Sequence, residues 1–205
     1  MSHTTIDAIL CLLWTLTYTL VLIGMERYKY PLISPCAQIA IASLEFATMI
    51  SLLISGIRWE NHVFVFYIMW TILELAIIGS QIRQGFITKK HVPLYLGVLI
   101  IVTLLMCILV AYRGHQLFFA LFNTIVGELL WLAHVRKKNY PMKPMVFVIF
   151  LSKFIADAMS VPVYFRQGGW IHNFMGVLIP VLDFVFIHTY FSRRAISEKT
   201  DSNNK

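Results

Sequence analysis

The sequence predicts an all-α integral membrane protein with seven transmembrane helices. Hydrophobic residues make up 59% of the 205 residues and charged residues only 13%, whereas a soluble domain is about 25% charged. The mean hydropathy is +0.74. The chain divides into seven apolar runs, each close to the roughly 20 residues that cross a bilayer. We therefore expect one membrane domain over residues 1–205, with a short cytosolic tail at about 193–205.

Each predicted span has recognisable ends. Pro31, Pro93 and Pro141 stand where helices are expected to start, and Gly56 and Gly114 stand where two are expected to stop. The predicted spans are residues 6–24, 33–56, 63–82, 92–112, 116–135, 144–163 and 172–191.

The basic residues orient the predicted bundle. Of the 17 Lys and Arg residues, thirteen fall in one alternating set of connections that includes the C-terminal tail. Three fall in the opposite set, and Lys153 lies inside a span. Because Lys and Arg accumulate in cytosolic loops, this split predicts an outside N-terminus and a cytosolic C-terminus. The net charge of +7 is thereby explained without a nucleic-acid partner.

The two halves of the chain resemble each other. The second and sixth spans both begin with a Tyr-Pro pair and carry an acid near the middle, and the third and seventh spans both carry a Leu-acid pair at mid-depth. This pattern predicts a parallel repeat of three helices, one linker helix and three more helices. The paired acids are Glu45 with Asp157 and Glu74 with Asp183.

Five of the ten acidic residues fall inside predicted spans: Glu45, Glu74, Glu128, Asp157 and Asp183. An ionised acid at the bilayer centre costs roughly 2.5–3.5 kcal/mol on the insertion scale. Five would cost on the order of 12–17 kcal/mol, which exceeds a typical folding free energy. These acids must therefore be paired, protonated or turned towards a polar cavity. A structural hydrogen-bond network is one interpretation, and a functional cavity is the one we favour.

Other residues join these acids by helical spacing. Tyr67, Trp70 and Glu74 share one face of the third span and predict an aromatic lining beside an acid, although aromatic residues are also common in membrane helices. Lys153 and Asp157 are four residues apart and predict an internal ion pair. Asn123 is either a site residue or a hydrogen-bonding contact between helices.

Missing motifs narrow the chemistry further. No pair of His residues has metal-ligand spacing, and the chain contains no CxxC, P-loop or GxGxxG motif. We therefore expect neither a metal nor a cofactor. Proton chemistry or transport by buried carboxyls is what remains.

Several short motifs resemble those of one family. They are Leu13-Trp14-Thr15-Leu16-Thr17-Tyr18, Tyr30-Pro31 running to Leu44-Glu45-Phe46, Trp70-Thr71-Ile72-Leu73-Glu74-Leu75, Asn123, the basic loop Arg136–Lys138 and Leu182-Asp183-Phe184. Together they resemble the integral-membrane terpene cyclases of fungal meroterpenoid and indole-diterpene pathways and their bacterial relatives.

The resemblance implies an enzyme of terpenoid biosynthesis. Its two essential acids would be Glu45 and Asp183, supported by Glu74, Asp157 and Lys153. Its substrate would be a lipophilic prenylated molecule, and its location the endoplasmic reticulum membrane of a eukaryote or the plasma membrane of a bacterium. A carboxyl desolvated in an apolar chamber keeps a proton that it can donate, and aromatic faces stabilise the resulting cation.

A small seven-helix transporter is the main alternative. Parallel three-helix repeats with acids at mid-depth would then bind substrate or couple protons. A receptor or assembly subunit is a third class, but loops this short leave little surface for a partner. An apolar chamber that is closed to water and opens laterally to lipid would favour the cyclase. A polar path that opens alternately to the two sides of the membrane would favour transport.

Overall fold

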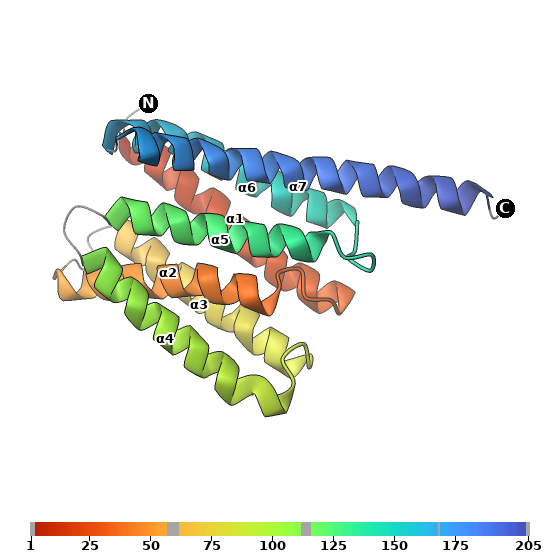
Figure 1. Ribbon diagram of the computed structural model, residues 1–205, viewed down its shortest axis with the longest axis horizontal. Helices are drawn as coiled ribbons and strands as arrows, with labels where there is room; N and C mark the ends of the chain where they lie inside the picture. The colour runs from red at the N-terminus through yellow and green to blue at the C-terminus, as the bar shows by residue number, and fades with distance from the viewer. Residues whose placement is uncertain (1–2, 57–61, 112–115, 168, 204–205) are drawn as a thin grey trace.

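The computed structural model describes residues 3–56, 62–111, 116–167 and 169–203, and within them it contains helices and no strand. The helices are α1 (His3–Tyr28), α2 (Pro35–Ile54), α3 (His62–Arg83), the short 3-10 helix η1 (Lys89–His91), α4 (Val92–Ala111), α5 (Gln116–Val135), α6 (Pro144–Gln167) and α7 (Trp170–Asn203). Figure 1 shows them as one elongated bundle, with α7 continuing past the other helices at its C-terminal end.

Six of the described helices are long and apolar enough to cross a membrane, which indicates an integral membrane protein. In α5 the described apolar stretch, Ala120–Val135, is shorter than in the other six. Large apolar side chains are exposed all over the bundle, for example Ile100, Ile101 and Ile108 on α4. Such a surface suits lipid rather than water.

Six helices close into a ring. Going round it, α1 packs against α6, α6 against α7, α7 against α5, α5 against α2, α2 against α3, and α3 against α1. Helix α4 lies outside the ring, mainly against α2. Each half of the chain therefore has its third helix between its first and second, and the ring interior is shared by both halves.

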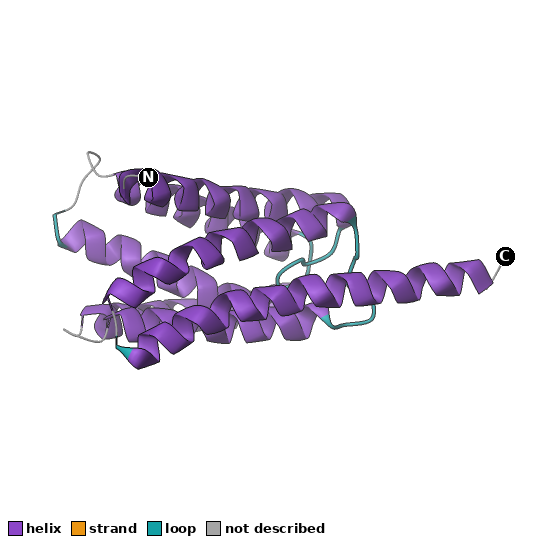
Figure 2. Ribbon diagram, turned by 90° about the horizontal axis from the view of Figure 1, so that it is seen from above, coloured by secondary structure: helices purple, strands orange, loops and turns teal. Residues whose placement is uncertain are grey.

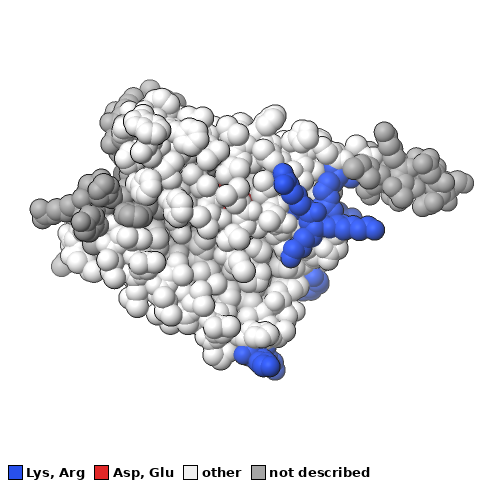
Figure 3. Space-filling model, in the orientation of Figure 1, with Lys and Arg blue, Asp and Glu red and all other residues white. Residues whose placement is uncertain are grey.

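One end of the bundle carries the connections α1–α2, α3–α4 and α5–α6 together with the C-terminus (Figures 1 and 2). We call it the basic end, because the Lys and Arg side chains visible in Figure 3 gather there. The α1–α2 connection is tied down at this end. The Leu32 carbonyl accepts hydrogen bonds from Trp131 Nε1 at 2.7 Å and from the Tyr140 hydroxyl at 2.8 Å, and the Ile33 carbonyl accepts one from Gln81 Nε2 at 3.0 Å.

The helix bounds agree with the predicted spans to within four residues, except at the C-terminal end of α7. Helix α1 continues to Tyr28 rather than residue 24, and α7 continues through the predicted tail to Asn203. Ser34 caps α2, since its hydroxyl accepts a hydrogen bond from the Ala37 amide at 3.1 Å, and Pro35 follows it. The predicted stop at Gly114 lies outside the described residues.

Candidate functional site

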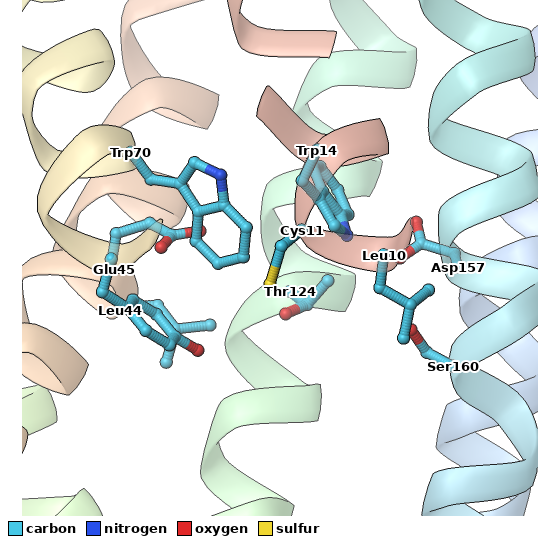
Figure 4. A pocket seen from close by; sticks show the side chains of 10 residues that line it. Leu10, Cys11, Trp14, Leu44, Glu45, Trp70, Thr124, Asp157 and Ser160 are labelled. Carbon is cyan, nitrogen blue, oxygen red and sulfur yellow. The ribbon is translucent and has the colours of Figure 1, made fainter. Parts of the chain in front are cut away.

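A cavity of about 280 Å³ lies inside the ring, in the half of the bundle away from the basic end. Helices α1, α2, α3, α5 and α6 contribute its walls. Its lining residues are Leu10, Cys11, Trp14, Leu44, Glu45, Tyr67, Trp70, Thr124, Asp157 and Ser160. In Figure 4, Glu45 and Trp70 lie on one side and Asp157 and Ser160 on the other, with Cys11 and Trp14 between them.

Aromatic rings from α1 and α3 form one wall of this cavity. The ring centroids of Tyr67 and Trp70 are 5.0 Å apart in an edge-to-face arrangement, and those of Trp14 and Tyr18 are 5.6 Å apart. The Trp70 indole N–H donates to Thr15 Oγ1 at 3.0 Å, which fixes the ring orientation. The predicted aromatic lining by Tyr67 and Trp70 is therefore present, and Trp14 extends it.

Glu45 sits against this wall beside a tyrosine. The Tyr18 hydroxyl donates to Glu45 Oε1 at 2.9 Å. The other oxygen, Glu45 Oε2, is buried without a hydrogen-bond partner among the described residues, and so are both oxygens of Glu74. Glu74 is fully buried and lies close enough to Glu45 and Tyr18 to interact electrostatically, but it does not line the cavity. None of the ion pairs between described residues joins a cation to Glu45 or Glu74.

Lys153 forms the centre of a second polar cluster. Its Nζ is 2.8 Å from Glu128 Oε1 and 2.8 Å from Asp157 Oδ2, and it also contacts Asp183 Oδ1. All four side chains are buried, with exposed side-chain fractions between 1% and 6%. The predicted ion pair of Lys153 with Asp157 is confirmed. Because one ammonium faces three carboxyls, this cluster is electrically neutral only when two of the carboxyls hold protons.

Asp157 belongs to both the cavity and the lysine cluster. It lines the cavity from α6 and pairs with Lys153 behind the wall. The Lys153 ammonium also lies 5.4 Å from the centroid of the Trp14 ring, a cation–π distance. Asp183, predicted as the second working acid, does not line the cavity but contacts Lys153, the partner of the cavity-lining Asp157.

The remaining predicted residue, Asn123, joins two helices. Its Nδ2 donates to the Ala40 carbonyl at 2.5 Å, across the α2–α5 contact. The next residue, Thr124, lines the cavity instead. Sequence reasoning missed Thr124, Cys11 and the attachment of Glu128 to Lys153. Only Glu128 gave a signal, as an acid inside a span, because a small cavity-lining residue such as Cys11 resembles any other residue of an apolar helix.

Six polar groups of the two clusters come in equal number from the two halves of the chain. Each half of the chain contributes one group from its first, second and third helix. The sets are Tyr18, Glu45 and Glu74 from α1, α2 and α3, and Glu128, Asp157 and Asp183 from α5, α6 and α7. Only the second set contacts a lysine, Lys153, whereas no described ion pair joins a cation to the first set.

Among the residues that the structure describes, no group of three or more His, Cys, Asp or Glu side chains is placed to hold a metal ion. The site is a cavity lined by one carboxyl next to a tyrosine, one carboxyl paired with a lysine, and the rings of Trp14, Tyr67 and Trp70. No family model matches the chain, and neither does any curated protein or solved structure.

Proposed function

We propose that this protein is a membrane-embedded terpene cyclase, which cyclises a lipophilic prenylated substrate after protonating it. The observation that carries the proposal is the cavity, which Glu45 and Asp157 line together with the rings of Trp14, Tyr67 and Trp70. A cation–olefin cyclisation needs a proton donor, an aromatic surface for the cation and exclusion of water. The cavity lining contains the carboxyls and the aromatic rings, and a surrounding bilayer would exclude water.

The neighbours of Glu45 and Asp157 indicate a different role for each carboxyl. Glu45 has a tyrosine rather than a cation as its partner, so burial keeps it neutral and able to donate a proton. Asp157 is paired with Lys153 and so has a cation rather than a neutral group as its partner. Glu45 would protonate an epoxide oxygen or an alkene carbon, and ring closure would then move the positive charge along the substrate. Asp157 would take the final proton, so that the product is an isomer of the substrate.

Asp183 acts in this proposal as a positioning residue. With Glu128 it competes with Asp157 for the single positive charge of Lys153. Asp183 therefore helps to fix the position of the Lys153 ammonium that Asp157 also contacts. The resemblance assigned this acid a direct role, whereas the cavity lining favours an indirect one through Lys153.

The test is expression of the full chain in a heterologous host that is supplied with prenylated substrates, with and without a terminal epoxide. Product analysis should reveal compounds of unchanged mass with at least one new carbon ring. Glu45→Gln should lower product formation by about 10²–10⁴-fold, the usual contribution of a general acid. Glu74→Gln is the matched control, because Glu74 is a second buried carboxyl beside Glu45 but does not line the cavity. Equal product from wild type and Glu45→Gln would overturn the proposal.

Deuterated water identifies the group that is protonated. Protonation of an alkene carbon leaves one carbon-bound deuterium in the product. Protonation of an epoxide leaves the deuterium on a hydroxyl, from which it washes out in ordinary water. The same experiment therefore supplies the substrate class along with the activity.

We also propose the parallel repeat and an outside N-terminus. The repeat is supported by the ring, since exchanging the two halves of the chain leaves its helix contacts unchanged, and by the equal number of polar groups from the two halves. The orientation is supported by the gathering of basic residues at one end (Figure 3). The membrane would be the endoplasmic reticulum of a eukaryote or the plasma membrane of a bacterium.

A proton-coupled transporter is the second candidate. The observation that favours it is the Lys153 cluster, because several ionisable groups at mid-membrane depth mark many proton pathways. Purified protein in liposomes that contain a pH-sensitive dye would distinguish the two. Substrate-dependent proton movement without any isomeric product supports transport, and isomeric product without proton movement supports the cyclase.

A further inference from the structure

A second hollow, of about 350 Å³, lies at the basic end, where the α5–α6 connection meets the C-terminal part of α7. Tyr140, Met142 and Pro144 form part of its lining. The other described lining residues are all basic: Lys138, Lys143, Arg193 and Arg194. Four cations around one hollow, with no acid among the described lining residues, favour an anionic ligand.

Arg193 is fixed in place within this hollow. Its Nη1 donates to the Val135 carbonyl at 2.5 Å and its Nη2 donates to the Lys138 carbonyl at 2.7 Å. A guanidinium carries five N–H groups, and these two bonds use two of them. The charge of Arg193 is therefore held between α7 and the α5–α6 connection by the backbone, before any ligand arrives.

The hollow lies at the level where lipid headgroups are expected. Two of the membrane-crossing segments, Pro144–Pro162 and Trp170–Ala195, end or begin among its lining residues. Helix α6 starts at Pro144, and a helix N-terminus favours a nearby anion. Met142 and Pro144 add an apolar surface beside the cations. A ligand that suits this arrangement has an anionic phosphate group next to an apolar part.

We propose that this hollow binds the phosphate group of an anionic membrane lipid. Basic residues next to a membrane span attract anionic lipids by about 1 kcal/mol each, and the hollow brings four of them around one position. The site is independent of the cavity that holds Glu45 and does not depend on the proposed cyclase activity.

The test compares two variants of the full chain that lose the same charge. Lys138→Gln/Lys143→Gln removes two cations from the hollow and leaves Arg193 to hold the connection. Lys89→Gln/Lys90→Gln removes two exposed cations from η1, at the same end but outside the hollow. Native mass spectrometry of the purified proteins would measure binding of phosphatidylglycerol, with phosphatidylcholine and inorganic phosphate as separate arms.

We expect the hollow variant to bind phosphatidylglycerol about tenfold more weakly or worse, from the loss of two adjacent cations. The η1 variant should stay within about threefold of wild type, and phosphatidylcholine should bind all three proteins equally. Equal losses in both variants would mean diffuse surface charge, and no loss in either would mean no site. Inorganic phosphate that displaces phosphatidylglycerol at equal concentration would mean a site for free phosphate. Each of these three results would overturn the proposal.

Discussion

The carboxyls inside the spans differ mainly in the side chains that they contact. Glu45 accepts a hydrogen bond from Tyr18, whereas Asp157 and Asp183 both contact Lys153. A carboxyl with a neutral partner is suited to give up a proton, and a carboxyl with a cationic partner is suited to receive one. This difference gives each residue its own expected behaviour when it is replaced.

Asp183→Asn should lower turnover sharply, and its effect should depend on pH. Because Asp183 is one of three carboxyls that contact Lys153, its replacement changes the charge of this cluster and should shift the pH at which turnover is half-maximal, while folded yield stays near that of wild type. Asp183→Glu should restore part of the activity. The measurements are pH–rate profiles of both variants. A loss of turnover with an unchanged pH profile and no rescue by Glu would mean that Asp183 is only structural.

Lys153→Met should destabilise the protein strongly. Removing one partner of a buried ion pair costs about 3–5 kcal/mol, and here three carboxyls lose their common cation. Lys153→Met/Asp157→Leu should recover part of this loss, because it also removes one of the stranded acids. Melting curves of the detergent-solubilised proteins would measure this, with the exposed Lys89→Met as control. A double variant no more stable than the single one would contradict the pairing.

For single residues, the sequence alone identified the polar side chains inside the spans but not which of them contact one another. Polar residues in apolar spans stand out, so Glu45, Asp157 and Lys153 were all found, and the spacing of four predicted the Lys153–Asp157 pair. The attachment of Glu128 and Asp183 to the same lysine depends on contacts between different helices. Helical spacing within one span carries no information about such contacts.

The close contact between helices α2 and α5 depends on a glycine. A Cβ atom on Gly127 would lie 3.0 Å from Ile41 Cγ1 and 3.6 Å from Ala40 Cβ, so Gly127 lets the two helices approach closely. Asn123 makes its hydrogen bond to Ala40 across the same contact.

Gly127→Leu should therefore separate α2 from α5 and lower the melting temperature, although leucine is the better helix former. Gly97→Leu on α4 is the matched control, because a Cβ there meets no atom within 4 Å, and it should leave stability unchanged. Melting curves of the purified variants would measure both effects. If Gly127→Leu is as stable as Gly97→Leu, the close approach is not needed for the contact.

The helices themselves were the most predictable part of the structure. Apolar length and the positions of proline and glycine depend on local sequence, so six of the seven predicted spans correspond to helices able to cross a membrane. The C-terminal part of α7 was missed because residues after Phe191 are polar, and hydropathy predicts membrane burial rather than helix. Polar residues such as those after Arg194 form helix without any apolar signal.

For the whole molecule, the charge distribution makes a prediction about orientation. Tags at the N-terminus and in the connection that contains Arg113 should be reached by membrane-impermeant reagents from outside. A tag after Arg193 should be reached only after the membrane is opened. The physical reason is the retention of Lys and Arg on the cytosolic side during insertion. An N-terminus protected in intact cells would contradict the proposed orientation.

The ring of six helices could not be read from the sequence. Seven spans joined by short connections fit many packing orders, and the observed order places α1 beside α6 and α5 beside α2. These contacts join the two halves and create the cavity between them. Internal similarity predicted two comparable halves, but it did not predict that their interiors would meet.

The partners of Lys153 are synthesised in a fixed order. The ribosome delivers Glu128 with α5 before the lysine itself, Asp157 follows one helical turn after the lysine, and Asp183 arrives only with α7. A nascent chain thus has a carboxyl ready for the ammonium before α6 enters the bilayer, and no stage of synthesis leaves that charge alone in lipid. Helix α7, the last to emerge, packs against both α5 and α6. When α7 packs, Lys153 gains its third carboxyl and the ring of six helices closes. A chain that ended before α7 would have neither the third carboxyl nor the closed ring.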